Sequence, residues 1–216
     1  MVQRELSATS LIEKIDAELP QTQCEQCGFQ GCYAYATAVA SGEAEYNRCP
    51  PGGEPVLKAL AKVLDRELIP LDLTCGEYKT PQVAYVDESL CIGCAKCLIA
   101  CPVDAIVGTR RMMHQIIESE CTGCELCIPP CPLDCIEIKK LPNKIDLSEQ
   151  IGLTEAQRKR ADYSRERFNA RKAREAKRET ITETTPPAEE LELADPVSSH
   201  EMLSLIDMAR QKFNDK

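Results

Sequence analysis

The sequence predicts an α+β protein with three parts: a small helical domain (residues 1–80), a duplicated cysteine-rich domain (81–141) and a helical and disordered tail (142–216). Two observations carry this division. The segment CIGCAKCLIACPVDAI (91–106) returns thirty residues later as CTGCELCIPPCPLDCI (121–136), and similarity at a fixed offset indicates a duplicated unit. All fourteen cysteines lie between residues 24 and 135, so the tail is chemically separate from the rest.

The composition argues against a large apolar core. The chain of 216 residues has no Trp and three Phe, and 28% of its residues are charged. Residues 1–20 carry charges throughout, and no stretch of about 18 apolar residues follows, which predicts neither a signal peptide nor a membrane span. We therefore expect a cytoplasmic protein, with peripheral attachment to the inner membrane as the alternative. Thiols stay reduced in the cytoplasm, where clustered cysteines more often bind metal.

Three helices are expected in the first domain. Ser10 and Glu13 have the spacing of a capping box, and the apolar residues that follow at helical spacing predict a helix that ends near Pro20. Residues 33–41 have a helical composition. Pro55 stands where a third helix starts, and an apolar stripe follows it.

In the duplicated domain, the sequence predicts short extended segments. AYVD enters the first cysteine loop and IIES enters the second. Each unit is expected to run strand, cluster loop, short helix, strand, and the two units are expected to pair about a pseudo-twofold axis.

Both repeated loops have the spacing CxxCxxCxxxCP, which is that of bacterial two-cluster ferredoxins. In that arrangement three thiolates of one loop bind a cubane 4Fe-4S cluster, and the fourth cysteine binds the other cluster. Zinc is the alternative, but a third cysteine two residues after a CxxC pair overcrowds a tetrahedral site. The predicted ligands are Cys91, Cys94, Cys97 and Cys131 for site B, and Cys101, Cys121, Cys124 and Cys127 for site C.

The two loops contain further positions with a structural role. Gly93 and Gly123 are expected where the backbone passes close to the cluster, and Pro102 and Pro132 direct the chain away from the last ligand.

An earlier group of four cysteines, Cys24, Cys27, Cys32 and Cys49, forms site A. Its spacing is compatible with zinc, a 2Fe-2S centre or a 4Fe-4S cluster. The nearby glycines and the Pro50–Gly53 run favour a tight wrap around a bulky group, which supports an iron-sulfur cluster.

Three motifs in one order, LPQTQCEQCGFQGCYAYA with RCPPGGE and the two ferredoxin loops, resemble the B subunit of the Rnf (Rsx) electron transport complexes over about residues 15 to 140. The resemblance implies a 4Fe-4S cluster on each of sites A, B and C. It also implies a relay of electrons to redox partner proteins within a membrane complex that couples redox to ion movement. Members of that family usually begin with a membrane-anchoring helix, whereas this sequence opens on a charged segment.

No residues for other chemistry are visible. The sequence has two histidines and no nucleophile with a base, phosphate loop or dinucleotide motif. We expect an electron carrier without a substrate site of its own. The alternatives are a free-standing ferredoxin for another oxidoreductase and a regulatory protein that contacts nucleic acid or membrane through the basic residues 155–179.

Several residues are given ordinary roles. The ten bases of residues 155–179 are interleaved with five acids, which is more typical of a solvated helix, capped here by Thr154 and Gln157. Residues 182–196 are expected to be a disordered linker, and the apolar stripe from Met202 to Phe213 a docking helix. Cys75 and Cys135 are expected to be spare thiols, and His114 a structural or exposed side chain.

Overall fold

The structure is a computed structural model that describes residues 2–142 and 149–184. Residues 1–173 form one compact unit and residues 174–216 form a second, so the division falls within the last helix. Across the described residues, no helix combines the length and apolar character that crossing a membrane requires. The expected linker and the stripe from Met202 to Phe213 lie almost entirely outside the described residues.

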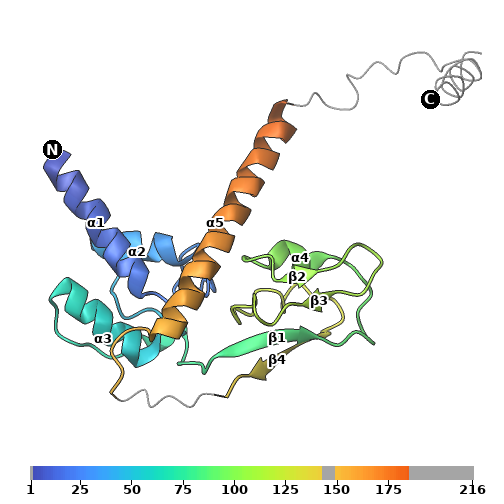
Figure 1. The fold of residues 1–216 in the computed structure, drawn as a ribbon, viewed down its shortest axis with the longest axis horizontal. Helices are drawn as coiled ribbons and strands as arrows, with labels where there is room; N and C mark the ends of the chain where they lie inside the picture. Colours follow the sequence, from blue (N-terminus) through green and yellow to red (C-terminus); the bar gives the residue numbers. More distant parts are fainter. Residues whose placement is uncertain (1, 143–148, 185–216) are drawn as a thin grey trace, which may run out of the picture. The chain divides into compact units, whose positions relative to one another are not determined.

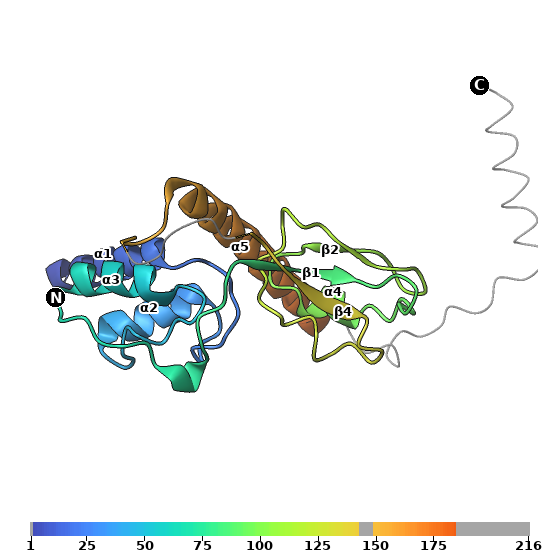
Figure 2. The same ribbon diagram turned by 90° about the horizontal axis from the view of Figure 1, so that it is seen from below.

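The first part is helical, as the sequence predicts (Figures 1 and 2). It contains α1 (Val2–Glu18), α2 (Cys32–Ser41), α3 (Gly53–Leu64) and a 3-10 turn (Leu73–Cys75). Helix α1 contacts both α2 and α3. The residues at the centre of their shared core are Ile15, Leu19, Tyr35, Val56 and Leu60.

One expected helix start is wrong. Ser10 and Glu13 lie inside α1, which already begins at Val2, so these residues cannot form a capping box. The apolar spacing nevertheless identifies the buried face, since Ile15 and Leu19 are completely buried.

The second part consists of two antiparallel ribbons. Strand β1 (Gln82–Val86) pairs with β4 (Ile136–Lys140), with Ala84 opposite Ile138. Between them in the chain, β2 (Ile106–Val107) pairs with β3 (Gln115–Ile116). The first and last strands of the domain are thus partners, which brings the end of the second repeat back to the start of the first (Figure 1).

The two repeats differ in one element. The first cysteine loop contains the short helix α4 (Lys96–Ala100), whereas the second forms turns over the same positions. Pro129 and Pro130 stand there in the second loop. Because proline lacks the backbone N–H and clashes with the preceding turn, these two residues explain the missing helix.

The basic segment is the helix α5 (Glu155–Thr184). Its start has the expected reciprocal cap, because Gln157 N donates to Thr154 Oγ1 (3.3 Å) and Thr154 N donates to Gln157 Oε1 (2.8 Å). The helix is not merely solvated. Five of its arginines bond to the rest of residues 1–173: Arg158, Arg160, Arg165, Arg167 and Arg171.

These arginines fall into two groups. Arg158 pairs with Glu18 (3.3 Å) and Arg165 pairs with Asp16 (2.7 Å), both in α1. The other three donate to backbone carbonyls of the cysteine loops: Arg160 to Cys121 (2.5 Å), Arg167 to Val103 (2.7 Å) and Asp104 (3.0 Å), and Arg171 to Leu98 (3.3 Å) and Ile99 (2.5 Å). The first half of α5 therefore ties α1 to both cysteine loops.

We predict that Arg165→Ala lowers the stability of the protein. Asp16 is buried, and removal of its guanidinium partner leaves a buried carboxylate that keeps its hydrogen bond from Gln21 but loses its charged partner. Loss of a charged hydrogen bond of this kind costs about 2 kcal/mol, which for a chain of this size lowers Tm by roughly 4–8 °C. Thermal unfolding followed by circular dichroism at equal iron content measures the shift.

The matched control is Lys159→Ala. Lys159 pairs with Glu155 (2.8 Å), but both side chains are exposed, so the change in Tm should be small. Equal Tm values for the two variants would contradict the role given to Arg165.

Candidate iron-sulfur sites

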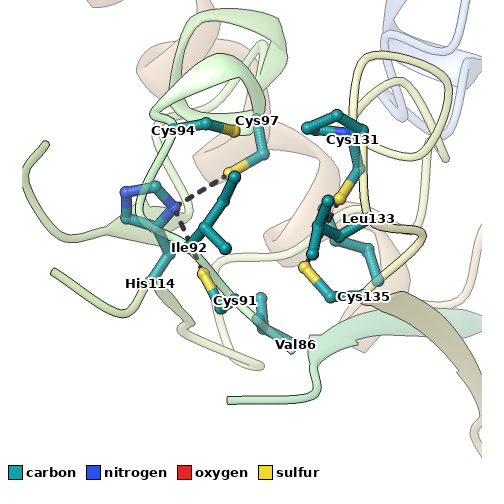
Figure 3. A pocket seen from close by; sticks show the side chains of 11 residues that line it. Val86, Cys91, Ile92, Cys94, Cys97, His114, Cys131, Leu133 and Cys135 are labelled. Atoms are coloured by element: carbon teal, nitrogen blue, oxygen red, sulfur yellow. Dashed lines mark hydrogen bonds between the residues drawn. The ribbon is translucent and has the colours of Figure 1, made fainter. Parts of the chain in front are cut away.

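One cavity gathers the cysteines expected for site B. It is lined by Cys91, Cys94 and Cys97 of the first loop and by Cys131 of the second. Figure 3 shows the sulfurs of Cys91 and Cys97 facing those of Cys131 and Cys135 across this cavity. Apart from the cysteines and His114, the wall consists of Val86, Ile92, Pro132, Leu133 and Ile136.

A second cavity gathers the cysteines expected for site C: Cys101 of the first loop with Cys121, Cys124 and Cys127 of the second. The two cavities share no lining residue. Each combines three cysteines of one loop with the fourth cysteine of the other loop, as the repeated spacing predicts.

Site A is assembled from the turn before α2 and the turn before α3. The burial of Cys49 and the neighbouring thiols of Cys32, Cys24 and Cys27 raise its pKa well above the usual range. Burial also raises the pKa of Cys32 to about 12. The four predicted cysteines of site A therefore lie close enough to interact electrostatically.

The loop of site A is held by buried amides. Gln23 Oε1 accepts from Cys32 N (2.8 Å), Gln23 Nε2 donates to Gln21 Oε1 (2.7 Å), and Gln21 Nε2 donates to Asp16 (2.9 Å). Gln21, Gln23 and Glu25 all have positive φ angles. Non-glycine residues adopt this conformation at a cost of about 1–3 kcal/mol each, which surrounding contacts must offset. The strained loop is thus fixed by its connection to α1.

The thiols of site C are also shielded from water. Burial raises the pKa values of Cys124 and Cys127 to about 12. Backbone groups also donate to sulfur in this site, among them Ala84 N to Cys121 Sγ (3.4 Å) and Ala105 N to Cys101 Sγ (3.2 Å). Such thiols are protonated at neutral pH in the free chain, so metal binding has to release their protons.

The donor set fits iron-sulfur clusters. The cavities of sites B and C each present their four predicted thiols in a mainly apolar wall, to which Cys135 adds a fifth thiol at site B, and thiolates are the usual ligands of these clusters.

The two loop glycines lie against backbone of other segments. Gly93 has φ +67°, and a Cβ atom there would lie 2.5 Å from Met112 N and 2.6 Å from Met112 O. Gly123, with φ +69°, approaches the backbone of Gln82 in the same way. Both glycines therefore permit close packing of the loop on another backbone segment.

The two remaining cysteines lie beside the sites. Cys135 lines the cavity of site B, with its sulfur 3.4 Å from that of Cys131. It is buried, as expected of a spare thiol. Cys75 accepts a hydrogen bond from Nε of Arg48 (3.4 Å), the residue that precedes Cys49.

Two contacts at the sites were missed by sequence reasoning. His114, expected to be structural or exposed, is buried with its imidazole against Cys97 and Cys91. The hydroxyl of Thr122 donates to the carbonyl of Thr22 (3.0 Å), which joins the loop of site C to that of site A. The repeat could have indicated that His114 lies near a site, because His114 stands before the second cysteine loop at the same distance as Ala84 stands before the first.

Comparisons with known families define the class of protein. Residues 84–138 match the model of a 4Fe-4S dicluster domain, and residues 19–51 match that of a putative Fe-S cluster. The chain is therefore an iron-sulfur protein with a ferredoxin-like dicluster domain.

Its curated relatives are named as the B subunit of an ion-translocating oxidoreductase complex. The one from Alkalilimnicola ehrlichii is 58% identical over 140 residues, which is 64% of this chain and 74% of the relative. The one from Hahella chejuensis is 59% identical over 135 residues, 62% and 68% of the two chains. The one from Azoarcus sp. is 60% identical over 107 residues, and the chain spans 58% of that relative. This chain belongs to the family of these ion-translocating oxidoreductase B subunits, which confirms the resemblance.

We predict that Gly93→Ala impairs cluster incorporation at site B. A Cβ at this position meets the backbone of Met112, which cannot move away as a flexible side chain could. Iron and sulfide per chain after anaerobic reconstitution should fall by about one 4Fe-4S cluster.

Gly42→Ala is the control for the glycine prediction. Gly42 also has a positive φ, +80°, but a Cβ there meets nothing within 4 Å. Both variants carry the cost of a left-handed alanine, and only Gly93→Ala carries the clash. Equal iron contents would show that the close approach does not matter.

Proposed function

We propose that the chain carries three 4Fe-4S clusters and relays single electrons between protein partners as a component of an ion-translocating oxidoreductase complex. The ligands are Cys24, Cys27, Cys32 and Cys49 at site A, Cys91, Cys94, Cys97 and Cys131 at site B, and Cys101, Cys121, Cys124 and Cys127 at site C. The observation that carries the proposal is the pair of cavities, each of which brings three cysteines of one loop together with the fourth cysteine of the other loop. The names of the relatives support membership in such a complex.

The domain division follows from the same proposal. Residues 1–80 form the domain of site A, residues 81–141 the dicluster domain and residues 142–216 the tail. The two family matches, at 19–51 and 84–138, fall within the first two. A pseudo-twofold relation between the repeats is supported by the pairing of β1 with β4 and of β2 with β3.

A bound 4Fe-4S cluster supplies one-electron oxidation and reduction. The chain's own residues hold the sites and set their order. Thr122 follows Cys121 of site C, Thr22 lies two residues before Cys24 of site A, and the hydrogen bond between them joins the two loops. Sites C and B are interlocked because each takes a cysteine from the other's loop. The sites therefore follow one another in the order A, C, B.

Arginines of α5 maintain this order. Arg165 holds α1, from which the loop of site A continues, and Arg160 holds the carbonyl of Cys121 at site C. Five of the ten bases of residues 155–179 thus have structural contacts within residues 1–173, which supports the electron carrier over the regulatory protein with a binding tail.

The first test is a cluster count. Anaerobically purified protein should contain about twelve irons per chain, and after reduction it should give the coupled EPR signals of two closely spaced clusters. Eight irons with one zinc would refute the assignment of site A. A chain that carries fewer than eight irons after full reconstitution would refute the relay.

A second test addresses the exchanged ligands. We predict that Cys101→Ala impairs site C, although Cys101 belongs to the first loop, and leaves site B loaded. The spectrum should then lack the coupling between two close clusters, while the signal of site B persists.

Cys135→Ala provides the comparison for this variant. Cys135 also lines a cluster cavity but is not assigned as a ligand, so its loss should leave about twelve irons. If Cys101→Ala disturbed site B first, the exchange of ligands would be wrong.

A further inference from the structure

The side chain of His114 lies within the wall of site B. It is 1% exposed. Its Nδ1 lies 3.4 Å from Cys97 Sγ and 3.9 Å from Cys91 Sγ (Figure 3), and its Nε2 lies 3.3 Å from the carbonyl oxygen of Thr109. The imidazole thus spans from the two thiols to the hairpin between β2 and β3.

The chemistry of a ligated thiolate decides the direction of this contact. A cysteine bound to iron has lost its proton, so its sulfur can only accept a hydrogen bond. Donation to Cys97 therefore requires the proton on Nδ1. The carbonyl of Thr109 can also only accept, so a neutral ring donates to one of these two groups and an imidazolium donates to both. With the proton on Nδ1, the contact becomes an N–H···S hydrogen bond to site B.

The equivalent position at site C has no such side chain. Ala84 stands seven residues before Cys91, as His114 stands seven residues before Cys121, so the two are repeat equivalents. Ala84 lies at site C, where its backbone N–H reaches the sulfur of Cys121 (3.4 Å) and its methyl group offers no donor. The duplicated sites therefore differ by the imidazole donor.

We propose that His114 is a positioning residue that donates a hydrogen bond from Nδ1 to the thiolates of site B and raises the reduction potential of that site. An added electron increases the negative charge on the thiolate sulfurs of Cys97 and Cys91. A fixed N–H donor stabilises that charge more in the reduced than in the oxidised state. The inference rests on the proposed cluster at site B.

The first test leaves site B and His114 unchanged and detects the contact between them directly. The chain has two histidines, His114 and His200. Full-length protein with His200→Ala, labelled with 15N-histidine, should show an 15N coupling to a reduced cluster in pulsed EPR, together with an exchangeable deuteron in D2O. A fully loaded protein without the 15N coupling would overturn the proposal.

The second test compares two variants. His114→Leu keeps an apolar volume and removes the donor, whereas His114→Gln keeps a side-chain N–H. In EPR-monitored redox titrations at one pH, His114→Leu should shift the reduced-to-oxidised ratio of site B about tenfold toward the oxidised state, or about 59 mV for one electron. His114→Gln should recover part of this shift.

Met113→Ala is the control, since Met113 is 58% exposed beside His114 in the same hairpin. It should leave the potential unchanged. No shift in His114→Leu, or an equal shift at sites B and C, would overturn the proposal. If the His114→Leu protein does not incorporate a cluster at site B, the proposal is tested by the 15N coupling and by the potential of His114→Gln. If the wild-type protein itself carried no cluster at site B, that result would instead refute the proposed function.

Discussion

The dicluster domain depends on its cysteines for cohesion. Its buried core consists of Val83, Ala84, Cys97, Cys101, Val103, Ala105, Ile106, Cys121, Cys127, Cys131, Cys135 and Ile136, so half of these residues are thiols. The remaining side chains are small or aliphatic, and two of the four strands have only two residues each. A core of this kind buries too little apolar area to be stable alone. The clusters, once bound, therefore supply free energy of folding as well as redox chemistry. The proposed exchange of ligands between the loops would make the two repeats fold together.

The helix α5 connects the helical part that contains site A to the dicluster domain. Guanidinium groups that bond to main-chain carbonyls do not depend on the side chains they meet, and their planar donors fix orientation. Arg160 and Arg167 reach such carbonyls beside Cys121 and Cys101, while Arg165 reaches Asp16 in α1. The alternation of bases and acids along α5 resembles that of a solvated helix, which explains why the role of these arginines could not be inferred from the sequence.

Much of the site could be predicted because cluster ligation imposes local spacing. The three-residue spacing of Cys91, Cys94 and Cys97 is recognised in the sequence alone. The same is true of the repeat, which predicts that each loop contributes a cysteine to the other loop's site. Helix and strand positions were also predictable, since the buried residues of α1 repeat at helical spacing. The contacts between distant segments were not. Nothing local links Thr122 to Thr22, and the start of α1 was misplaced because Ser10 has the sequence of a cap within a longer helix.

The departures from repeat symmetry have functional meaning. Two identical sites at the same distance from solvent would have equal potentials, and neither direction of electron movement between them would be favoured. In this chain, repeat equivalents differ at several places around the sites, among them His114 against Ala84, Cys135 against Ala105, and Pro129 and Pro130 against the end of α4. Arg160 and Arg167 add positive charge beside the backbone of site C, whereas His114 acts on the sulfurs of site B. Duplication thus accounts for the proposed ligands, and divergence of their surroundings makes the two sites unequal, which gives electron movement between them a preferred direction.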